Sequence, residues 1–191
     1  MQKLSKLMII LTKAHLKKIM TKLVKNYYKI WENDSYTLEA TIVRSLWEAR
    51  VIKSFEKNLK KILQEIFDSS KAKFLKSNIL ISILFSGDEQ VAELNKYFRN
   101  INKPTNVLSF PSTQINAKDK FFLGDIIFSS QTIIYEAERD NKNLEDHLIH
   151  LFIHGVLHLL DYDHETENDA SIMESLEVQI LKNLNIDNPY K

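Results

Sequence analysis

Residues 147–164 read HLIHLFIHGVLHLLDYDH and hold five of the six histidines of the chain. His154 and His158 are four residues apart, so on a helix their side chains lie one turn apart on the same face, about 40° from each other. His164 comes six residues later, where we expect the helix to end and the chain to fold back. The spacing predicts a metal site on a helix and the following turn, with His154, His158 and His164 as its ligands.

The rest of this helix is apolar on nearly every side, which indicates that the helix is buried. A single histidine on a helix is usually an ordinary core or surface residue. A row of buried imidazoles, however, needs partners for its ring nitrogens, and a metal ion provides them. Three nitrogen ligands with an open fourth position are typical of catalytic zinc sites, so we expect one Zn²⁺ ion.

The spacing of the three histidines is that of the metzincin motif of zinc proteases, H-E-x-x-H-x-x-G-x-x-H. Gly155 stands where that motif has the glutamate that acts as general base in proteolysis. Asp161 stands where the motif has the glycine of the turn. Aspartate is one of the few other residues that tolerate a positive φ, at a cost of about 1 kcal/mol. The metal ligands are therefore kept, whereas the protease base is not.

The chain has 191 residues, 44% of them hydrophobic, and no cysteine. This length supports one core and one domain. The lack of cysteine excludes disulfides, cysteine-ligated zinc and thiol catalysis, and it suits a reducing compartment, so we expect a cytoplasmic protein. No apolar run approaches the roughly 20 residues of a membrane span. The oligomeric state is not predictable from the sequence.

Charge is divided unevenly along the chain. Residues 1–76 hold 17 Lys and Arg against 7 Asp and Glu, whereas residues 77–191 hold 9 against 18. The basic part can attract a polyanion. The acidic part contains the histidine row, where carboxylates favour the binding of a cation.

The first 31 residues contain eight lysines and no acidic residue, and their apolar residues recur at helical spacing. We therefore expect a basic amphipathic helix. We treat residues 1–35 as an extension of a single domain that spans residues 36–191. Four interpretations of the extension stay open: an extra helix packed on the domain, an RNA-binding arm, an artefact of the start site, and a membrane-surface or targeting segment.

The hydrophobic periodicity of the remaining chain predicts alternating strands and helices. We expect four strands, over residues 36–46, 78–85, 107–110 and 122–129. We expect helices over residues 47–67, 88–98 and 130–140, then the histidine helix, then a last helix that begins with a capping box at residues 166–169. Pro111 places the strand before it at a sheet edge. The predicted fold is α+β, with a small mixed four-stranded sheet packed with helices.

Three blocks of the chain resemble the YbeY family, the single-strand-specific endoribonucleases and rRNA maturation factors of bacteria. Residues 154–164, HGVLHLLDYDH, match the family pattern H-G-x-L-H-L-x-G-Y-D-H except that Asp161 replaces glycine. Residues 103–111, KPTNVLSFP, match K-P-T-[DN]-V-L-S-F-P, and residues 123–126 match L-G-D-I. The blocks stand in the family's order. Residues 1–35 are not part of the usual family pattern.

The resemblance implies a zincin-like α+β fold with zinc held by His154, His158 and His164. It also implies a functional role for Arg99, which the residue pattern alone indicates only as a solvated helix end. The implied activity is metal-dependent endonucleolytic cleavage of single-stranded RNA in rRNA processing, including maturation of the 3′ end of the small-subunit (16S) rRNA, and ribosome quality control. The implied partners are rRNA and the ribosome or small-subunit proteins.

Two other functions stay open. The spacing of the triad favours a zinc metalloprotease, and Gly155 opposes it. A ribosome-assembly binding protein with a structural zinc is the other alternative; Asp161 leaves room for it, and the open fourth ligand position opposes it. For RNA cleavage we expect Arg99 to hold a phosphate through two hydrogen bonds. The attacking group is a metal-activated water or the 2′-OH of the RNA, and the sequence does not choose between them.

Three further residues allow two roles each. Asp163 orients a metal ligand or caps the turn. His150, one helical turn before His154, contacts the substrate or is a buried residue with a partner. Asp125 is a turn residue or a carboxylate that supports a ligand.

Overall fold

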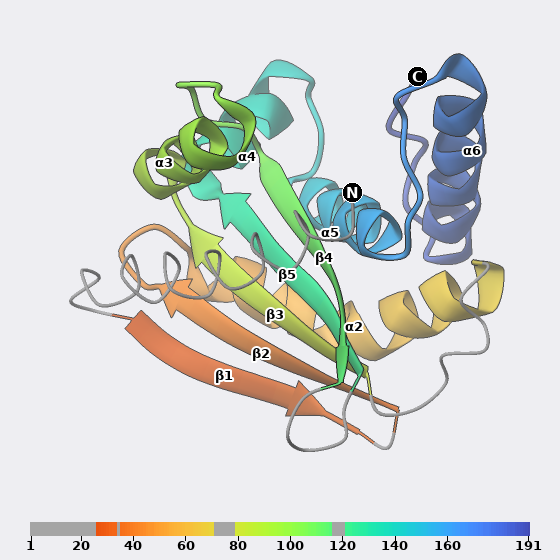
Figure 1. Ribbon diagram of the computed structural model, residues 1–191, viewed down its shortest axis with the longest axis horizontal. Coiled ribbons are helices and arrows are strands. Elements are labelled where there is room, and N and C mark those ends of the chain that lie inside the picture. The colour runs from red at the N-terminus through yellow and green to blue at the C-terminus, as the bar shows by residue number, and fades with distance from the viewer. Residues whose placement is uncertain (1–25, 34, 71–78, 116–120) are drawn as a thin grey trace.

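The computed structural model describes residues 26–33, 35–70, 79–115 and 121–191, which form one mixed sheet covered by helices (Figure 1). The strands of the described chain are β1 (Asn26–Glu32), β2 (Tyr36–Val43), β3 (Ile79–Ser86), β4 (Val107–Ile115) and β5 (Phe121–Ser129). Its helices are α2 (Ala49–Ser69), α3 (Asp88–Arg99), α4 (Ser130–Arg139), α5 (Leu144–Leu159) and α6 (Glu167–Asn183). The α+β class predicted from the sequence is confirmed. No helix in these ranges is long and apolar enough to span a membrane.

The strands follow the order β1-β2-β3-β5-β4 across the sheet. The inner strands β2, β3 and β5 are parallel to one another, and the edge strands β1 and β4 run antiparallel to their neighbours. β4 therefore lies at an edge, as Pro111 predicted. The histidine helix α5 follows α4 and packs beside β4 and β5, so the metal motif lies near this edge of the sheet.

The sheet has one strand more than the four that we predicted. Residues 26–32, which we expected to belong to the basic helical extension, form β1 and pair with β2. Their sequence, NYYKIWE, is rich in aromatic residues, which fit a half-buried pleated surface. Trp31 is buried and contacts the ring of Phe55 in α2, while Tyr28 and Ile30 are exposed. Residues 1–25 lie outside the described ranges, so the four interpretations of them stay open.

The main core lies between one face of the sheet and helices α2 and α5. Phe55 of α2 contacts Phe152 of α5 and Phe85 of β3, with ring centroids 5.0 and 5.6 Å apart. Phe85 in turn contacts Phe128 of β5. Such aromatic pairs contribute about 0.5–1.5 kcal/mol each beyond the area that they bury. These rings fix α5 against both the sheet and α2.

Helix α3 covers the opposite face of the sheet. A second, smaller apolar cluster forms there, made of Leu84, Val91, Leu94, Leu108 and Ile127. Because Leu108 belongs to β4, this cluster also fixes the position of α3 relative to the edge strand. Arg99, the last residue of α3, is thereby held near β4.

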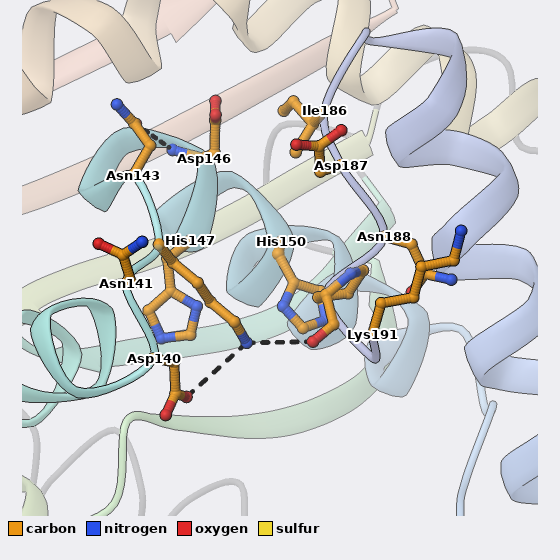
Figure 2. Close-up of a pocket in the computed structure, with 12 residues that line it drawn as sticks. Asp140, Asn141, Asn143, Asp146, His147, His150, Ile186, Asp187, Asn188 and Lys191 are labelled. Carbon is orange, nitrogen blue, oxygen red and sulfur yellow. Dashed lines mark hydrogen bonds and ion pairs between the residues drawn. The ribbon is translucent and has the colours of Figure 1, made fainter.

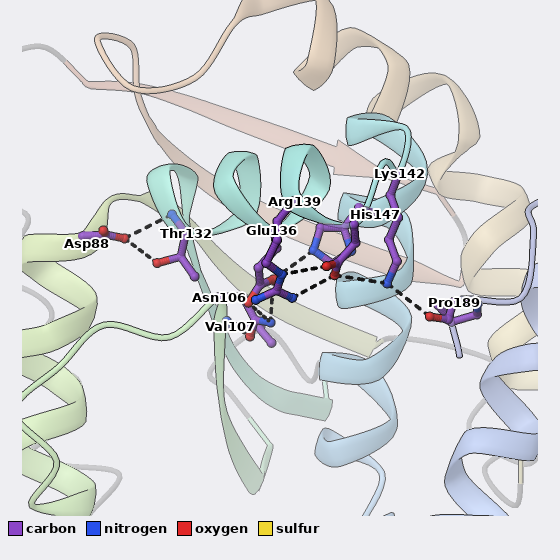
Figure 3. A network of polar contacts seen from close by, with 10 residues as sticks. Asp88, Asn106, Val107, Thr132, Glu136, Arg139, Lys142, His147 and Pro189 are labelled. Carbon is purple, nitrogen blue, oxygen red and sulfur yellow. Dashed lines mark hydrogen bonds and ion pairs between the residues drawn. The ribbon is translucent and has the colours of Figure 1, made fainter. Parts of the chain in front are cut away.

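Polar contacts tie the helices and the loop before β4 together (Figure 3). Asp88, in the first turn of α3, accepts hydrogen bonds from the backbone N–H and the hydroxyl of Thr132 in the first turn of α4. Glu136, further along α4, accepts hydrogen bonds from Asn106 (3.0 Å) and from Nε2 of His147 (2.9 Å). The loop between α3 and β4 is therefore joined to α4, and α4 to α5.

Two glycines lie where β5 and α5 pack closely against their neighbours. Gly124 of β5 has a φ of 147°, and a Cβ added there would lie 2.3 Å from the carbonyl oxygen of Phe110 in β4. Gly155 of α5 packs on the sheet, and a Cβ added there would lie 3.1 Å from Oγ of Ser109. The first contact is with backbone in a conformation that L residues rarely adopt, whereas the second is with a side chain.

We expect Gly124→Ala to lower the free energy of unfolding by at least about 2 kcal/mol, because the new methyl group meets a backbone oxygen and the strained φ must be kept. Gly155→Ala is the matched control. The nearest neighbours of its methyl group are all side-chain atoms. Alanine also has a better helix propensity than glycine, which offsets about 1 kcal/mol of the cost of these contacts. Urea unfolding followed by circular dichroism measures both variants. Equal losses in the two variants would contradict this account of Gly124.

Candidate metal centre

The structure brings His154, His158 and His164 together beside the C-terminal end of α5. His154 and His158 stand on consecutive turns of the helix, and His164 belongs to the loop after it. One nitrogen of each ring lies within 4.8 Å of the others. The Nε2 atoms of His154 and His158 are 3.0 Å apart, and the ring of His164 stacks on that of His154. The three side chains thus surround one point.

A Schellman motif ends α5 and turns the chain back. The N–H of Tyr162 donates to the carbonyl of Leu157 and the N–H of Asp161 to the carbonyl of His158, both at 3.1 Å. This motif needs one residue in the left-handed conformation just after the helix. Asp161 occupies that place with a φ of 61°. Aspartate therefore forms the turn that we expected it to tolerate, and His164 reaches the helix again.

Hydrogen bonds set the orientation of both helix histidines. Nδ1 of His158 lies 3.0 Å from the carbonyl oxygen of Tyr162, and Nδ1 of His154 lies 2.9 Å from Oε1 of Glu177. A carbonyl or a carboxylate oxygen only accepts, so each Nδ1 carries the proton and donates. Each Nε2 is left with a lone pair directed toward the other ring. Two such lone pairs at 3.0 Å repel each other unless a cation lies between them.

The protonation state of His158 suits a metal ligand. Burial of its ring, together with the nearby His154, lowers the pKa of His158 to about 4. The imidazole is therefore neutral at neutral pH, which is the form that binds a metal ion.

Glu177 of α6 completes this arrangement, and we did not single it out from the sequence. It is fully buried, and besides His154 it accepts hydrogen bonds from Nε2 of His150 (2.7 Å) and from the hydroxyl of Tyr190 (2.5 Å). Burial raises the pKa of Glu177, but the hydrogen bonds from His150 and His154 outweigh it and hold the pKa at about 2. The side chain is therefore a charged carboxylate at neutral pH.

The sequence contained a sign of this burial. In the sequence, the helical spacing of Ile172, Leu176, Ile180 and Leu184 indicates that these residues form the inward face of the last helix. Ile172 is in fact 51% exposed, and the buried positions are Met173, Glu177, Ile180 and Leu181. Glu177 stands four residues after Met173 and three before Ile180, so an acidic residue occupies the middle of the apolar stripe. An acid in that position needs a buried partner.

A pocket of about 660 Å³ opens beside the triad, and Arg99 lines it together with all three histidines. The pocket is also lined by Thr105, Asn106, Val107, Ser109, Pro111, Asp161, Tyr162, Asp163 and Glu165. Arg99 makes no hydrogen bond or ion pair with the residues that the structure describes. The loop after it is held by Asn95, whose side chain donates to the carbonyl of Lys103 at 2.8 Å. Arg99 is therefore available to an anion in this pocket.

The neighbouring residues take simpler roles. Oδ1 of Asp163 accepts the backbone N–H of His164 at 2.7 Å, so Asp163 caps the turn. Asp125 lies within β5, beside Ser82 of β3 and Phe110 of β4, and is not part of the pocket lining. His150 is mostly buried and bonded to Glu177.

The donor set fits zinc. A tetrahedral zinc ion with Zn–N bonds of about 2.0–2.1 Å requires ligating nitrogens about 3.3 Å apart. The Nε2 atoms of His154 and His158 are a few tenths of an ångström closer than that, and neither accepts a hydrogen bond from any other described group. Three imidazoles also leave one of four coordination positions for water or substrate.

Comparison with known proteins extends this description. The family model "Endoribonuclease YbeY" matches residues 46–185. The protein named Endoribonuclease YbeY in Bartonella quintana is 39% identical over 158 residues, which cover 81% of this chain and 96% of that protein. Its namesake in Bartonella bacilliformis is 49% identical over 112 residues, covering 58% and 71%. The solution structure of TM1509 from Thermotoga maritima aligns with a TM-score of 0.47 at 21% identity, over 75% of this chain and 95% of that one.

The matched region contains the histidine triad, Arg99 and Glu177. It also contains the edge strand β4 and the Schellman turn at Asp161, which shape the pocket. Both the matched length of the family model and the near-complete coverage of the Bartonella quintana protein point to one conclusion. This chain belongs to the YbeY family.

Proposed function

We propose that this chain is a metal-dependent endoribonuclease that cleaves single-stranded RNA, with one zinc ion held by His154, His158 and His164. The observation that carries the proposal is the shared pocket, which is lined both by the three histidines and by the guanidinium of Arg99, a group that pairs with no described residue. A cation and an arginine side by side suit a phosphodiester group. The relatives named Endoribonuclease YbeY support the same reaction class.

We further propose that the reaction belongs to rRNA processing in the cytoplasm. It includes maturation of the 3′ end of the 16S rRNA and ribosome quality control, with rRNA and the ribosome or small-subunit proteins as partners. Membership of the YbeY family supports this assignment. The excess of Lys and Arg in residues 1–76 supports a polyanionic partner.

Each part of the centre has a role in this reaction. When bound, zinc lowers the pKa of a coordinated water to about 7 and polarises a phosphoryl oxygen. Arg99 holds the phosphate through two parallel N–H···O bonds and stabilises the charge that develops on its oxygens. The carbonyl of Tyr162 and the carboxylate of Glu177 keep the rings of His158 and His154 in place.

The surroundings of Gly155 argue against the metalloprotease alternative. A Cβ at this position would already lie 3.1 Å from Oγ of Ser109 and 3.3 Å from the side chain of Ile126. The helix packs directly on the sheet here, so the glutamate of the protease motif has no space. Cleavage of RNA does not need that glutamate, because a metal-activated water or the 2′-OH can attack.

We expect His158→Ala to lose both zinc and cleavage of a labelled single-stranded RNA. Arg99→Ala should keep zinc and lower the cleavage rate by about 10²–10³-fold, since it removes one stabilising group from the transition state. Gel-resolved cleavage and the zinc content of each purified protein measure the two effects. Casein, assayed in parallel, should remain intact.

Arg50→Ala is the matched control for Arg99. Arg50 is also exposed, but it pairs with Glu48 and with Glu145 at the N-terminal end of α5, the end opposite the triad. This variant should cleave RNA like the wild type. Intact RNA beside full zinc occupancy in the wild type would instead support the ribosome-assembly binding protein, or an enzyme that works only on the ribosome. Cleavage of casein would support the protease.

We expect an RNA with a single 2′-deoxy nucleotide at the scissile position to be cleaved still. A zinc ion held by three imidazoles would keep one coordination position for water and would lower the pKa of that water to about 7, so water could attack without the 2′-OH. Cleavage of the modified RNA and of its unmodified twin, mapped on the same sequencing gel, gives the answer. A block confined to the modified position would assign the attack to the 2′-OH.

A further inference from the structure

We propose that Glu177 is the positioning residue of the metal centre, and that Tyr190, the next-to-last residue of the sequence, holds it in place. The carboxylate turns Nε2 of His154 toward the metal, while Tyr190 and His150 fix the carboxylate itself. The inference rests on the proposed function, because it requires the triad to bind a metal. It goes beyond that function by making residues outside the triad determine the affinity for the metal.

Glu177 sets the orientation of His154. The side chain of His154 is 23% exposed; its Nε2 lies 3.0 Å from Nε2 of His158, and its Nδ1 lies 2.9 Å from Oε1 of Glu177. The contact with Glu177 keeps the proton on Nδ1 and limits rotation of the ring. A metal-ligating histidine commonly donates its second nitrogen to a carboxylate in this way, which orients the ring and makes the ligating nitrogen more basic.

Glu177 also brings a buried negative charge to the metal centre. Glu177 is the one acidic side chain in the described part of the chain that is fully buried. Its hydrogen-bond partners there are two histidines and a tyrosine, with no lysine or arginine among them. A buried carboxylate is tolerated only where hydrogen bonds or positive charge compensate for the loss of water. A metal ion on His154 would add a positive charge one imidazole ring away from the carboxylate.

The last residues of the sequence hold Glu177 in turn. Tyr190 donates its hydroxyl to Oε2 of Glu177, and its ring lies edge-on to that of His150, with centroids 5.7 Å apart. Just before it, the carbonyl of Pro189 accepts a hydrogen bond from Lys142 at 3.1 Å (Figure 3). Asn188 and Lys191, which flank these two residues, line one pocket together with His150 (Figure 2). The end of the chain is therefore attached to the loop before α5 through Pro189 and to Glu177 through Tyr190.

The space around these contacts agrees with a supporting role. A hollow of about 320 Å³ is lined by His154, His164, Glu177 and Tyr190, on the side of the triad toward α6. The larger pocket with Arg99 shares His154 and His164 with this hollow but contains neither Glu177 nor Tyr190. Glu177 and Tyr190 thus support the triad from behind, away from the proposed place of the phosphate.

A matched control exists on the same helix. His147 donates Nε2 to Glu136 at 2.9 Å, so α5 carries a second histidine–carboxylate pair two turns before His154. His147 is not part of the triad. A change in Glu136 therefore removes the same kind of contact without touching a metal ligand.

The experiment measures the affinity of the whole chain for Zn²⁺ by competition with a chromophoric chelator, and the visible spectrum of the Co²⁺-loaded protein. Glu177→Gln keeps the size of the side chain but removes its charge, and we expect zinc binding about 10- to 100-fold weaker with altered Co²⁺ bands. Tyr190→Phe should weaken zinc binding less, with a smaller change of the bands. Glu136→Gln should leave both unchanged.

The outcomes separate this inference from the proposed function. If the wild-type chain binds neither Zn²⁺ nor Co²⁺, the proposed metal site is wrong, and the proposed function fails with it. If the wild type binds zinc and Glu177→Gln binds it with the same affinity and shows the same Co²⁺ bands, the positioning role is wrong. Weakening in Glu136→Gln as great as in Glu177→Gln would also overturn it, since the loss would then reflect general destabilisation. If Glu177→Gln does not fold, Tyr190→Phe decides, with weaker zinc binding for the proposal and unchanged binding against it.

Discussion

The structure depends on one constraint, which is that a buried helix carries a row of imidazoles. Helix α5 contacts the sheet, α2, α4 and α6, so little of its surface faces water. A polar ring nitrogen in such a place must find a partner or remain costly. The neighbouring elements supply these partners: Glu136 for His147, Glu177 for His150 and His154, and the carbonyl of Tyr162 for His158. Among the described residues, Nδ1 of His147 and Nδ1 of His150 stay without a hydrogen-bond partner, and at the triad the Nε2 atoms of His154 and His158 face each other.

The parts of this arrangement that follow local rules were predictable from the sequence. The spacing of His154 and His158 indicated a shared helical face, and the left-handed turn at Asp161 follows from the small number of residues that tolerate it. The extra strand β1 was not predictable in this way, because the apolar residues of the first 31 residues recur at helical spacing and its buried residue, Trp31, packs on Phe55 in a distant helix. Glu177 was missed for a similar reason: an acid on an apolar stripe needs a partner, but only the packing of α6 against α5 shows which one.

The role of Arg99 was predictable neither from local rules nor from an unusual residue pattern. From pattern alone it was a solvated helix end, and only the resemblance to the YbeY family gave it a role. Three structural features bring it to the pocket: the apolar cluster that holds α3 to β4, the end of α3 at Asn100 with a φ of 59°, and the anchored loop that follows. None of these could be read from the residues around Arg99. Other arginines differ from it, since Arg50 and Arg139 are each paired with carboxylates on the surface.

The distribution of charge around the triad follows from the same constraint. The buried carboxylate of Glu177 lies behind the triad, and the guanidinium of Arg99, which pairs with no residue in the described part of the chain, lies in front, in the larger pocket. An anionic substrate that enters this pocket meets Arg99 and is separated from Glu177 by the ring of His154. A carboxylate at position 155, as in the protease motif, would put negative charge on the helix at the triad itself, where it would repel a phosphate. Gly155 carries no such charge, and a Cβ added there would already lie 3.1 Å from Oγ of Ser109 and 3.3 Å from the side chain of Ile126. Position 155 thus adds no negative charge to the helix beside the triad.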